Sequence, residues 1–582
     1  MARVNATTGF VIVLPRHRLL GEPRFLLTRR PALTSLLLGG CLLGGIMWQA
    51  AREEHDAQAA SPAETHPTVP LFDNLGTLHH AITTTSERAQ RYFDQGLRLV
   101  YAFNHEEAVR AFEETSRLDP SAAMAYWGVA LALGTNINAA MDRGKARRAW
   151  EAVQKARAHS AHVTAAERGY IEALSKRYSP KGRSRSNLDK AYADAMRSLW
   201  REFPEDPDAG VLFAEALMDL HPWDLWTADG QPRAGTDEIL STLESILAQY
   251  PDHPGACHYY IHAVEASPAP ERALPCAERL PGLMPGAGHL VHMPAHTYTR
   301  LGRYHEAAER NVEAAHVDRA YLAGTHATSD YAESYYAHNL HFLWASLTME
   351  GRRADALKAA RELTGMIAED EARKDKWKEL FLAAPLWSMI RFGQWDELVR
   401  EPAPAKELRL VQGMWRLGRG MALAATGRLP GAEGELVVLS GLTKRVGRDR
   451  TAEEKTQRAL LKIAEHLLAG EIALRRQKYA DAIKQLEAAV KLEDGLSYSE
   501  PRFWPIPVRH YLGAALLTAG RAEEAEAVYR TDLAKNPNNG WAFQGLTQSL
   551  RLQQKSSEAE EAEQQFATAW AFADVSVTAS RF

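Results

Sequence analysis

The chain has 582 residues, with 69 Lys and Arg against 73 Asp and Glu. This near balance excludes the positively charged surface that nucleic-acid binding requires. A chain of this length accommodates several domains, or one array that grows by repetition. Its apolar residues recur with helical rather than alternating spacing, which predicts an all-helical protein.

The first segment, residues 1–51, is predicted to be a signal peptide or a membrane anchor. An uncharged run at residues 31–51 follows five arginines: Arg16, Arg18, Arg24, Arg29 and Arg30. A basic flank before an apolar run favours export, and this run is long for a signal-peptide core but adequate for a membrane span. Cleavage near Ala57-Gln58-Ala59 and retention as an anchor are both open. We therefore expect an exported protein, periplasmic or anchored to the membrane by residues 31–51.

Residues 52–84 are predicted to be a flexible linker. Outside the export segment the chain has two cysteines, Cys257 and Cys276. In an oxidising compartment they either form a disulfide or remain two buried thiols, and their spacing in the sequence does not decide between these states.

From residue 85 onwards the sequence is periodic. In GLRLVYAFNHEEAVRAFEETSRLDP, four small, aromatic or proline residues stand at fixed offsets: Gly96, Ala108, Phe112 and Pro120. This pattern resembles the tetratricopeptide repeat, in which they take positions 8, 20, 24 and 32. Less regular units open near Ala123 and Pro207. The same register fits units whose first positions are Pro254, Gly288, Ala337, Glu379, Gly413, Ile463, Ile506 and Gly540.

The resemblance implies an all-α, right-handed solenoid of about ten helix pairs, in which stacking of neighbours supplies the core. We expect an N-terminal solenoid at residues 85–370 and a C-terminal solenoid at residues 371–582. In this family, positions 2, 5, 9 and 12 of each first helix line a concave groove that holds ligands.

Seven histidines occupy those groove positions in three successive units: His258, His262, His289, His292, His296, His338 and His341. Residues four apart on a helix lie about 5–6 Å apart at Cβ, so two imidazoles of one helix can converge on one ion. We therefore predict a metal site formed by these histidines. Pro294 interrupts the helix between His292 and His296, so the sequence leaves the direction of His289 and His292 open.

Imidazole ligands suit copper, zinc, iron or nickel and disfavour magnesium or calcium. Copper and zinc are the favoured ions, and iron is a further candidate. Seven histidines exceed the ligand set of one ion, so either some of them support others or two or more ions share the groove. Glu265, at position 12, is the candidate catalytic residue. Either it is a solvated groove residue, or it is a ligand, an orienting partner of an imidazole or a general base.

These patterns predict an exported metalloprotein, a metal-dependent oxidoreductase or hydrolase. The alternative is an envelope scaffold whose groove binds a peptide or partner protein, with membrane contact through the N-terminal segment if that segment is uncleaved. The loop DLHPWDLW and the preceding helix supply three candidate substrate-binding residues, Glu215, His221 and Trp223. Either this loop caps the groove, or its tryptophans pack under an insertion.

Overall fold

The computed structural model describes residues 69–180, 184–325, 331–445 and 451–582. The predicted signal or anchor segment at residues 1–51 lies outside these residues. From Leu71 to Phe582 the chain forms one compact unit. Among the described helices, none combines the length and the apolar character needed to cross a membrane.

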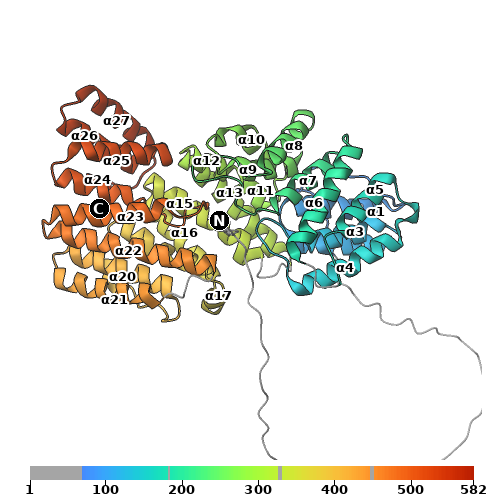
Figure 1. Cartoon of the computed structure of the whole chain (residues 1–582), viewed down its shortest axis with the longest axis horizontal. Coiled ribbons are helices and arrows are strands. Elements are labelled where there is room, and N and C mark those ends of the chain that lie inside the picture. The colour runs from blue at the N-terminus through green and yellow to red at the C-terminus, as the bar shows by residue number, and fades with distance from the viewer. Residues whose placement is uncertain (1–68, 181–183, 326–330, 446–450) are drawn as a thin grey trace, which may run out of the picture. The chain divides into compact units, whose positions relative to one another are not determined.

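Consecutive helices pack in pairs that follow one another from the N-terminal to the C-terminal end (Figure 1). The first five pairs are α1 (Glu87–Tyr101) with α2 (His105–Leu118), α3 (Ala123–Ala132) with α4 (Arg143–Ala158), α5 (Ala165–Ser175) with α6 (Arg185–Glu202), α7 (Pro207–Met218) with α8 (Thr236–Gln249), and α9 (Pro254–Val264) with α10 (Leu274–Leu283). In the next pair the first helix is divided, so that α11 (Gly288–His292) and α12 (Pro294–Arg300) pack on α13 (Tyr304–Gly324).

The later pairs are α15 (Ala337–Glu350) with α16 (Arg353–Met366), α18 (Lys378–Arg391) with α19 (Trp395–Arg400), α20 (Arg409–Ala425) with α21 (Leu429–Arg445), α22 (Ala452–Arg475) with α23 (Tyr479–Asp494), α24 (Val508–Thr518) with α25 (Ala522–Lys535), and α26 (Gly540–Leu552) with α27 (Ser556–Ala569). Short helical elements complete the chain: η1 (Ser160–His162), η2 (Pro270–Ala273), the π-helical η3 (Ala332–Tyr336) and α17 (Glu369–Lys374). In the described residues, β-structure is limited to two isolated bridges. The all-α prediction is therefore confirmed.

Glycines allow two neighbouring helices to pack closely against one aromatic ring, and this close packing is typical of the predicted repeat. A Cβ atom at Gly96 of α1 would lie 2.5 Å from the ring of Phe112, and one at Gly128 of α3 would lie 2.4 Å from it. The ring of Tyr529 is enclosed in the same way by Gly513 of α24 and Gly545 of α26. The same packing unit thus recurs near both ends of the array, which is the property that defines a repeat solenoid.

The apolar core divides into two clusters close to α13. One gathers residues from Leu75 to Ala307 together with Phe342, and the other gathers residues from Ala308 to Ala562. The boundary predicted between residues 370 and 371 remains a prediction. Cys257 and Cys276 are buried free thiols.

Residues 71–84 differ from the predicted flexible linker because they lie against the helices. The backbone N–H of Phe72 donates to Gln95, and that of Thr83 donates to Glu167. Leu75 is buried in the first core cluster. Apolar burial and satisfied backbone groups order this segment, and composition alone did not reveal them.

Candidate metal centre

The predicted histidines lie on the first helices of three successive pairs: α9, the α11–α12 segment and α15. Pro254 begins α9, where its missing N–H costs no hydrogen bond, and the His253 side chain caps the helix by accepting from Ala256 N–H. The helix therefore starts one turn before His258. Four residues later His262 emerges on the same side, and its ring centroid is 4.9 Å from that of His258.

The predicted interruption at Pro294 is present, because α11 ends at His292 and α12 begins at Pro294. Met293 between them keeps right-handed helical angles, with φ −52° and ψ −34°. The chain therefore continues in the same helical sense, and the rings of His292 and His296 still face each other at 4.9 Å between centroids.

His258, His262 and His289 form a group that we call the first triad. One ring nitrogen of each lies within 4.8 Å of the corresponding atoms of the other two. The Nε2 atoms of His258 and His289 are 3.2 Å apart. All three side chains are buried, so they face one another rather than solvent.

His292, His296 and His338 form the second triad, with the same mutual reach of 4.8 Å. The Nε2 atoms of His292 and His296 are 3.0 Å apart. The ring of His338 on α15 lies 4.9 Å from that of His292, between centroids. His292 and His296 are buried and His338 is half-buried.

Hydrogen bonds at Nδ1 turn the Nε2 atoms of several rings towards the centre of the cluster. Nδ1–H of His258 donates to the carbonyl of Tyr101 at 2.7 Å, because a carbonyl can only accept. Nδ1–H of His292 donates to Oδ1 of Asn311, also at 2.7 Å. The amide nitrogen of Asn311 is held by the carbonyl of Ala307, which fixes Oδ1 as the acceptor. Partners of this kind set the tautomer and direction of metal-binding imidazoles.

Glu265, at the end of α9, holds one histidine of each triad. One carboxylate oxygen accepts from Nδ1–H of His262 at 3.1 Å, and the other accepts from Nδ1–H of His296. Both oxygens are engaged, which matches the orienting role among the three that the sequence left open, rather than that of a free general base. Glu265, His262 and His296 are also close enough to act together as direct ligands.

The Nε2 atoms of His292 and His296 consequently face each other as two acceptors. Each ring carries its proton on Nδ1, so a neutral pair has two lone pairs opposed at 3.0 Å. Elsewhere in the cluster, Nε2 of His262 and Nδ1 of His289 are buried without a hydrogen-bond partner. Buried polar atoms are rarely left unpaired. A cation between the facing Nε2 atoms of His292 and His296, either a proton or a metal ion, removes the repulsion between their lone pairs.

Burial determines the charge state of these groups. Desolvation, followed by the charge of neighbouring imidazoles, lowers the pKa of His258, His289, His292 and His338 well below its usual value. Burial acts to raise the pKa of Glu265, but the charges and hydrogen bonds of His296 and His262 outweigh it and hold this pKa at about 2. The shifts favour the neutral, metal-binding form of His258, His289, His292 and His338, next to an ionised carboxylate at Glu265.

Each triad is bounded by a phenylalanine that sequence reasoning did not single out. Phe103, just after α1, lies with its ring centroid 4.5 Å from that of His258 and stacks on His289 at 5.5 Å. Its φ of 57° is unusual for a phenylalanine. Phe342 on α15 lies 4.4 Å from His296. These rings exclude water from the buried side of the cluster.

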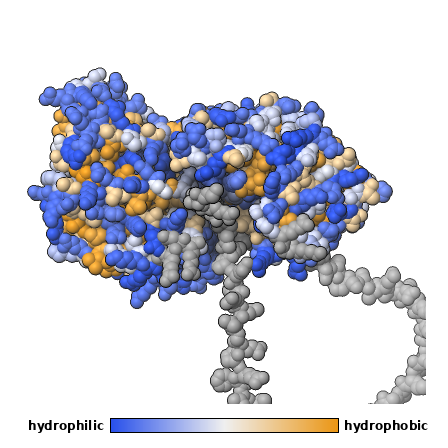
Figure 2. Space-filling view, in the orientation of Figure 1, coloured by the Kyte–Doolittle hydropathy of each residue, from blue (hydrophilic) through white to orange (hydrophobic). Residues whose placement is uncertain are grey.

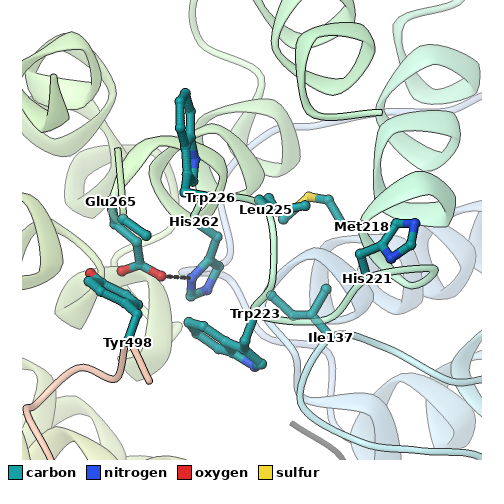
Figure 3. A pocket seen from close by; sticks show the side chains of 10 residues that line it. Ile137, Met218, His221, Trp223, Leu225, Trp226, His262, Glu265 and Tyr498 are labelled. Atoms are coloured by element: carbon teal, nitrogen blue, oxygen red, sulfur yellow. Dashed lines mark hydrogen bonds and ion pairs between the residues drawn. The ribbon is translucent and has the colours of Figure 1, made fainter. Parts of the chain in front are cut away.

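A pocket of about 20 Å³ adjoins His262 and Glu265 (Figure 3). The ring of Trp223 lies edge-on to His262 at 5.3 Å between centroids. Tyr498 lies beside the carboxylate of Glu265. The remaining wall is mainly apolar: Ile137, Met218, His221, Leu225, Trp226 and Ala266. This space is enough for about one water molecule.

Of the predicted substrate-binding residues, His221 and Trp223 line this pocket and Glu215 does not. Glu215 is buried near Arg177 and Asp219, and burial raises its pKa to about 7 against the charge of Arg177. His341 is likewise outside both triads, because its ring stacks on Trp344 at 5.3 Å. At position 5 of its unit, His341 is turned towards the second apolar core rather than towards His338.

A further group of ionisable residues, His80, Asp206 and Asp208, was not predicted. Asp208 accepts hydrogen bonds from His80 at 2.8 Å and from the hydroxyl of Tyr101 at 2.5 Å. The carbonyl of Tyr101 is the acceptor for Nδ1–H of His258. The hydrogen bonds of Asp208 and Tyr101 are therefore linked to the first triad and help to hold His258 in position. Tyr101, Asn311 and Tyr498 carry no sequence pattern that marks them, because they reach the cluster from other parts of the chain.

The helix order and the enclosed aromatic rings decide the type of fold. Predicted units open at the first residue of α11, α15 and α26, and Phe112 and Tyr529, at position 24 of the predicted register, each lie against two glycines. The fold is of the tetratricopeptide-repeat type. No family model matches the chain, and no curated protein matches it.

Several solved structures are similar to this tetratricopeptide-type chain at low sequence identity. The human IFIT1 dimer with m7Gppp-AAAA is 13% identical, with 84% of this chain and 91% of that chain covered and a TM-score of 0.31. The P58(IPK) TPR domain is 14% identical, with 81% and 99% covered and a TM-score of 0.21. Scores of this size carry no argument about the site.

Proposed function

We propose that the protein is an exported helical-repeat metalloprotein whose buried histidine cluster binds transition-metal ions. The facing Nε2 atoms of His292 and His296 support this proposal most strongly, because neither can donate to the other. A proton would satisfy this one pair only. A metal ion would use the third imidazole of the triad as well.

The spacing fits such an ion. With metal–nitrogen bonds of about 2.0–2.1 Å, two imidazole nitrogens on one tetrahedral ion lie roughly 3.3 Å apart. The observed separations are 3.0 Å in the second triad and 3.2 Å in the first. Partners at Nδ1, including a carboxylate, form the second layer that metal-binding histidines normally have.

The ligand chemistry favours copper or zinc, with iron as a further candidate, because every member of both triads is an imidazole. The pocket beside His262 gives a small molecule access to the centre. Imidazole-bound copper or iron would support oxidation, and imidazole-bound zinc would support hydrolysis by activating water. We propose a metal-dependent oxidoreductase or hydrolase on this basis.

The alternative, a scaffold that binds a peptide or partner protein, is the common role of concave solenoid surfaces. Five of the six triad histidines are buried and His338 is half-buried, which argues against direct contact of these five with a peptide. The face in Figure 2 is mainly hydrophilic, with hydrophobic residues in scattered patches. Among the described residues, the large exposed apolar side chains are Val312, Val437, Val438, Leu552 and Phe572. They are spread over separate parts of the chain.

Metal analysis of the purified, chelator-washed protein tests the proposal. After expression with copper and zinc supplied, we expect metal to remain bound in the wild type and to be lost in a His258→Gln, His292→Gln double variant. His466→Gln is the matched control, because His466 on α22 pairs with Gln485 away from the cluster. Circular dichroism establishes that the variants remain helical. Absence of retained metal in the wild type would contradict the proposal.

A further inference from the structure

The histidines divide into two complete ligand sets rather than forming one. The first and second triads share no residue, and each contains its own close Nε2 pair, His258 with His289 and His292 with His296. Three imidazoles and one open position form the usual protein environment of a catalytic zinc ion. One ion does not normally take six imidazoles.

The two sets lie in contact with each other. Ring centroids of His262 and His296 are 5.3 Å apart, and those of His289 and His292 are 5.6 Å apart. Glu265 bonds to Nδ1 of one histidine in each triad, so a single carboxylate positions both sets. Ions held by the two triads would occupy adjoining sites, as in two-metal centres.

The positive charge of two metal ions in this site would require an additional, negatively charged ligand. Two divalent ions would bring four positive charges into a buried site whose imidazoles are neutral, and Glu265 supplies one negative charge. Uncompensated charge inside a protein is costly. A small anion between the ions would reduce the excess and fill the open position of each.

Resting on the proposed function, we infer that the cluster is a two-ion centre, with three imidazoles on each ion and a small bridging anion of the hydroxide or azide class. The pocket beside Trp223 and Tyr498 limits what can reach the ions, because about 20 Å³ admits a ligand of roughly the size of water. Hydroxide has this size, and azide tests whether a longer anion reaches the same position.

Metal stoichiometry of the copper-loaded full chain tests the number of ions. We expect two ions per chain in the wild type and one in each of two variants, His258→Gln in the first triad and His338→Gln in the second. His466→Gln should keep two. One ion in the wild type would overturn the inference and leave the proposed function intact, whereas no retained ion would overturn both. The wild-type result stands even if a variant fails to fold.

Titration with azide tests the bridge. In the wild type holding two copper ions, we expect a new azide-to-copper absorption band and a paramagnetic signal that integrates to well below the total copper, because bridged ions couple magnetically. The two single-triad variants should instead give a paramagnetic signal that accounts for all of their copper, and any azide band there comes from a single copper ion. Two ions with a full, uncoupled signal and no response to azide would overturn the bridging ligand.

Discussion

At the scale of single residues, the chemistry of the site depends on which nitrogen of each imidazole is free. Sequence position placed His258, His262, His289, His292, His296 and His338 correctly as a group, but it did not show that Tyr101, Asn311 and Glu265 hold their Nδ1 atoms. His341 has the same residue type and a groove position, yet its ring stacks on Trp344. Side-chain direction in three dimensions, rather than residue type, separates the candidate ligand histidines from a histidine packed in the core.

Glu265→Gln should weaken metal binding by roughly 10- to 100-fold, the usual effect of removing an orienting partner. A Gln side chain has one acceptor oxygen in place of two, so either His262 or His296 loses its partner at Nδ1. Competition with a coloured chelator measures the change. Glu306→Gln, at an exposed ion pair on α13, is the control. Equal affinity in wild type and Glu265→Gln would show that Glu265 does not position the imidazoles.

His80 should make the stability of the protein depend on pH. Burial acts to lower its pKa, but the hydrogen bond and charge of Asp208, with Asp206 and Asp94, raise the pKa of His80 from 6.5 to about 9. The folded state therefore binds this proton more tightly than the unfolded state, and the stabilisation is complete below about pH 6.5 and lost as the pH rises through about 9. The shift corresponds to about 3 kcal/mol.

Unfolding free energies of wild type and His80→Gln at about pH 6 and about pH 10 measure this contribution. The difference between the two proteins should shrink by about 3 kcal/mol at the higher pH. His79→Gln is the comparison, because the His79 side chain is 58% exposed and pairs with Asp94. A difference that is equal at both pH values would contradict the assignment.

At the scale of helices, close packing depends on glycines, which have no side chain, as much as on the aromatic rings that they face. Gly96 and Gly128 enclose Phe112, and Gly513 and Gly545 enclose Tyr529. These small and aromatic positions gave the register, because they allow helix backbones to approach closely in the units that carry them. The pair α5 and α6 lacks the pattern and was not predicted as a unit.

Gly128→Ala should destabilise the region of α1 to α3 by about 1–3 kcal/mol, because the new methyl group would overlap the Phe112 ring. The loss should be largest in these helices, since most contacts of a repeat unit are with its neighbours. Hydrogen exchange of α1 to α3 and the thermal midpoint measure it. Gly434→Ala on α21, where a Cβ atom meets nothing within 4 Å, is the control and should be neutral or slightly stabilising. In a double variant, Phe112→Leu should recover part of the loss.

At the scale of the whole molecule, the cluster lies where three successive helix pairs meet and where the apolar core divides. Its surroundings come from distant segments: Phe103 follows α1, and Tyr498 lies in the connection before α24. Residues 71–84 join them through His80 and Asp208. No local sequence pattern marks these residues, because the tertiary fold, rather than spacing along the chain, brings them next to the histidine cluster.

The sequence by itself determined the helical-repeat fold and the six histidines that converge, since both depend on periodic spacing along one helix or between adjacent units. Only the tertiary structure decided that five of these six histidines are buried, that the six divide into two triads, and that Glu265 serves both. It also decided that His341 and Glu215 lie elsewhere and that residues 71–84 are packed. These properties depend on side-chain direction and on contacts between residues up to several hundred positions apart, which spacing along the chain does not specify.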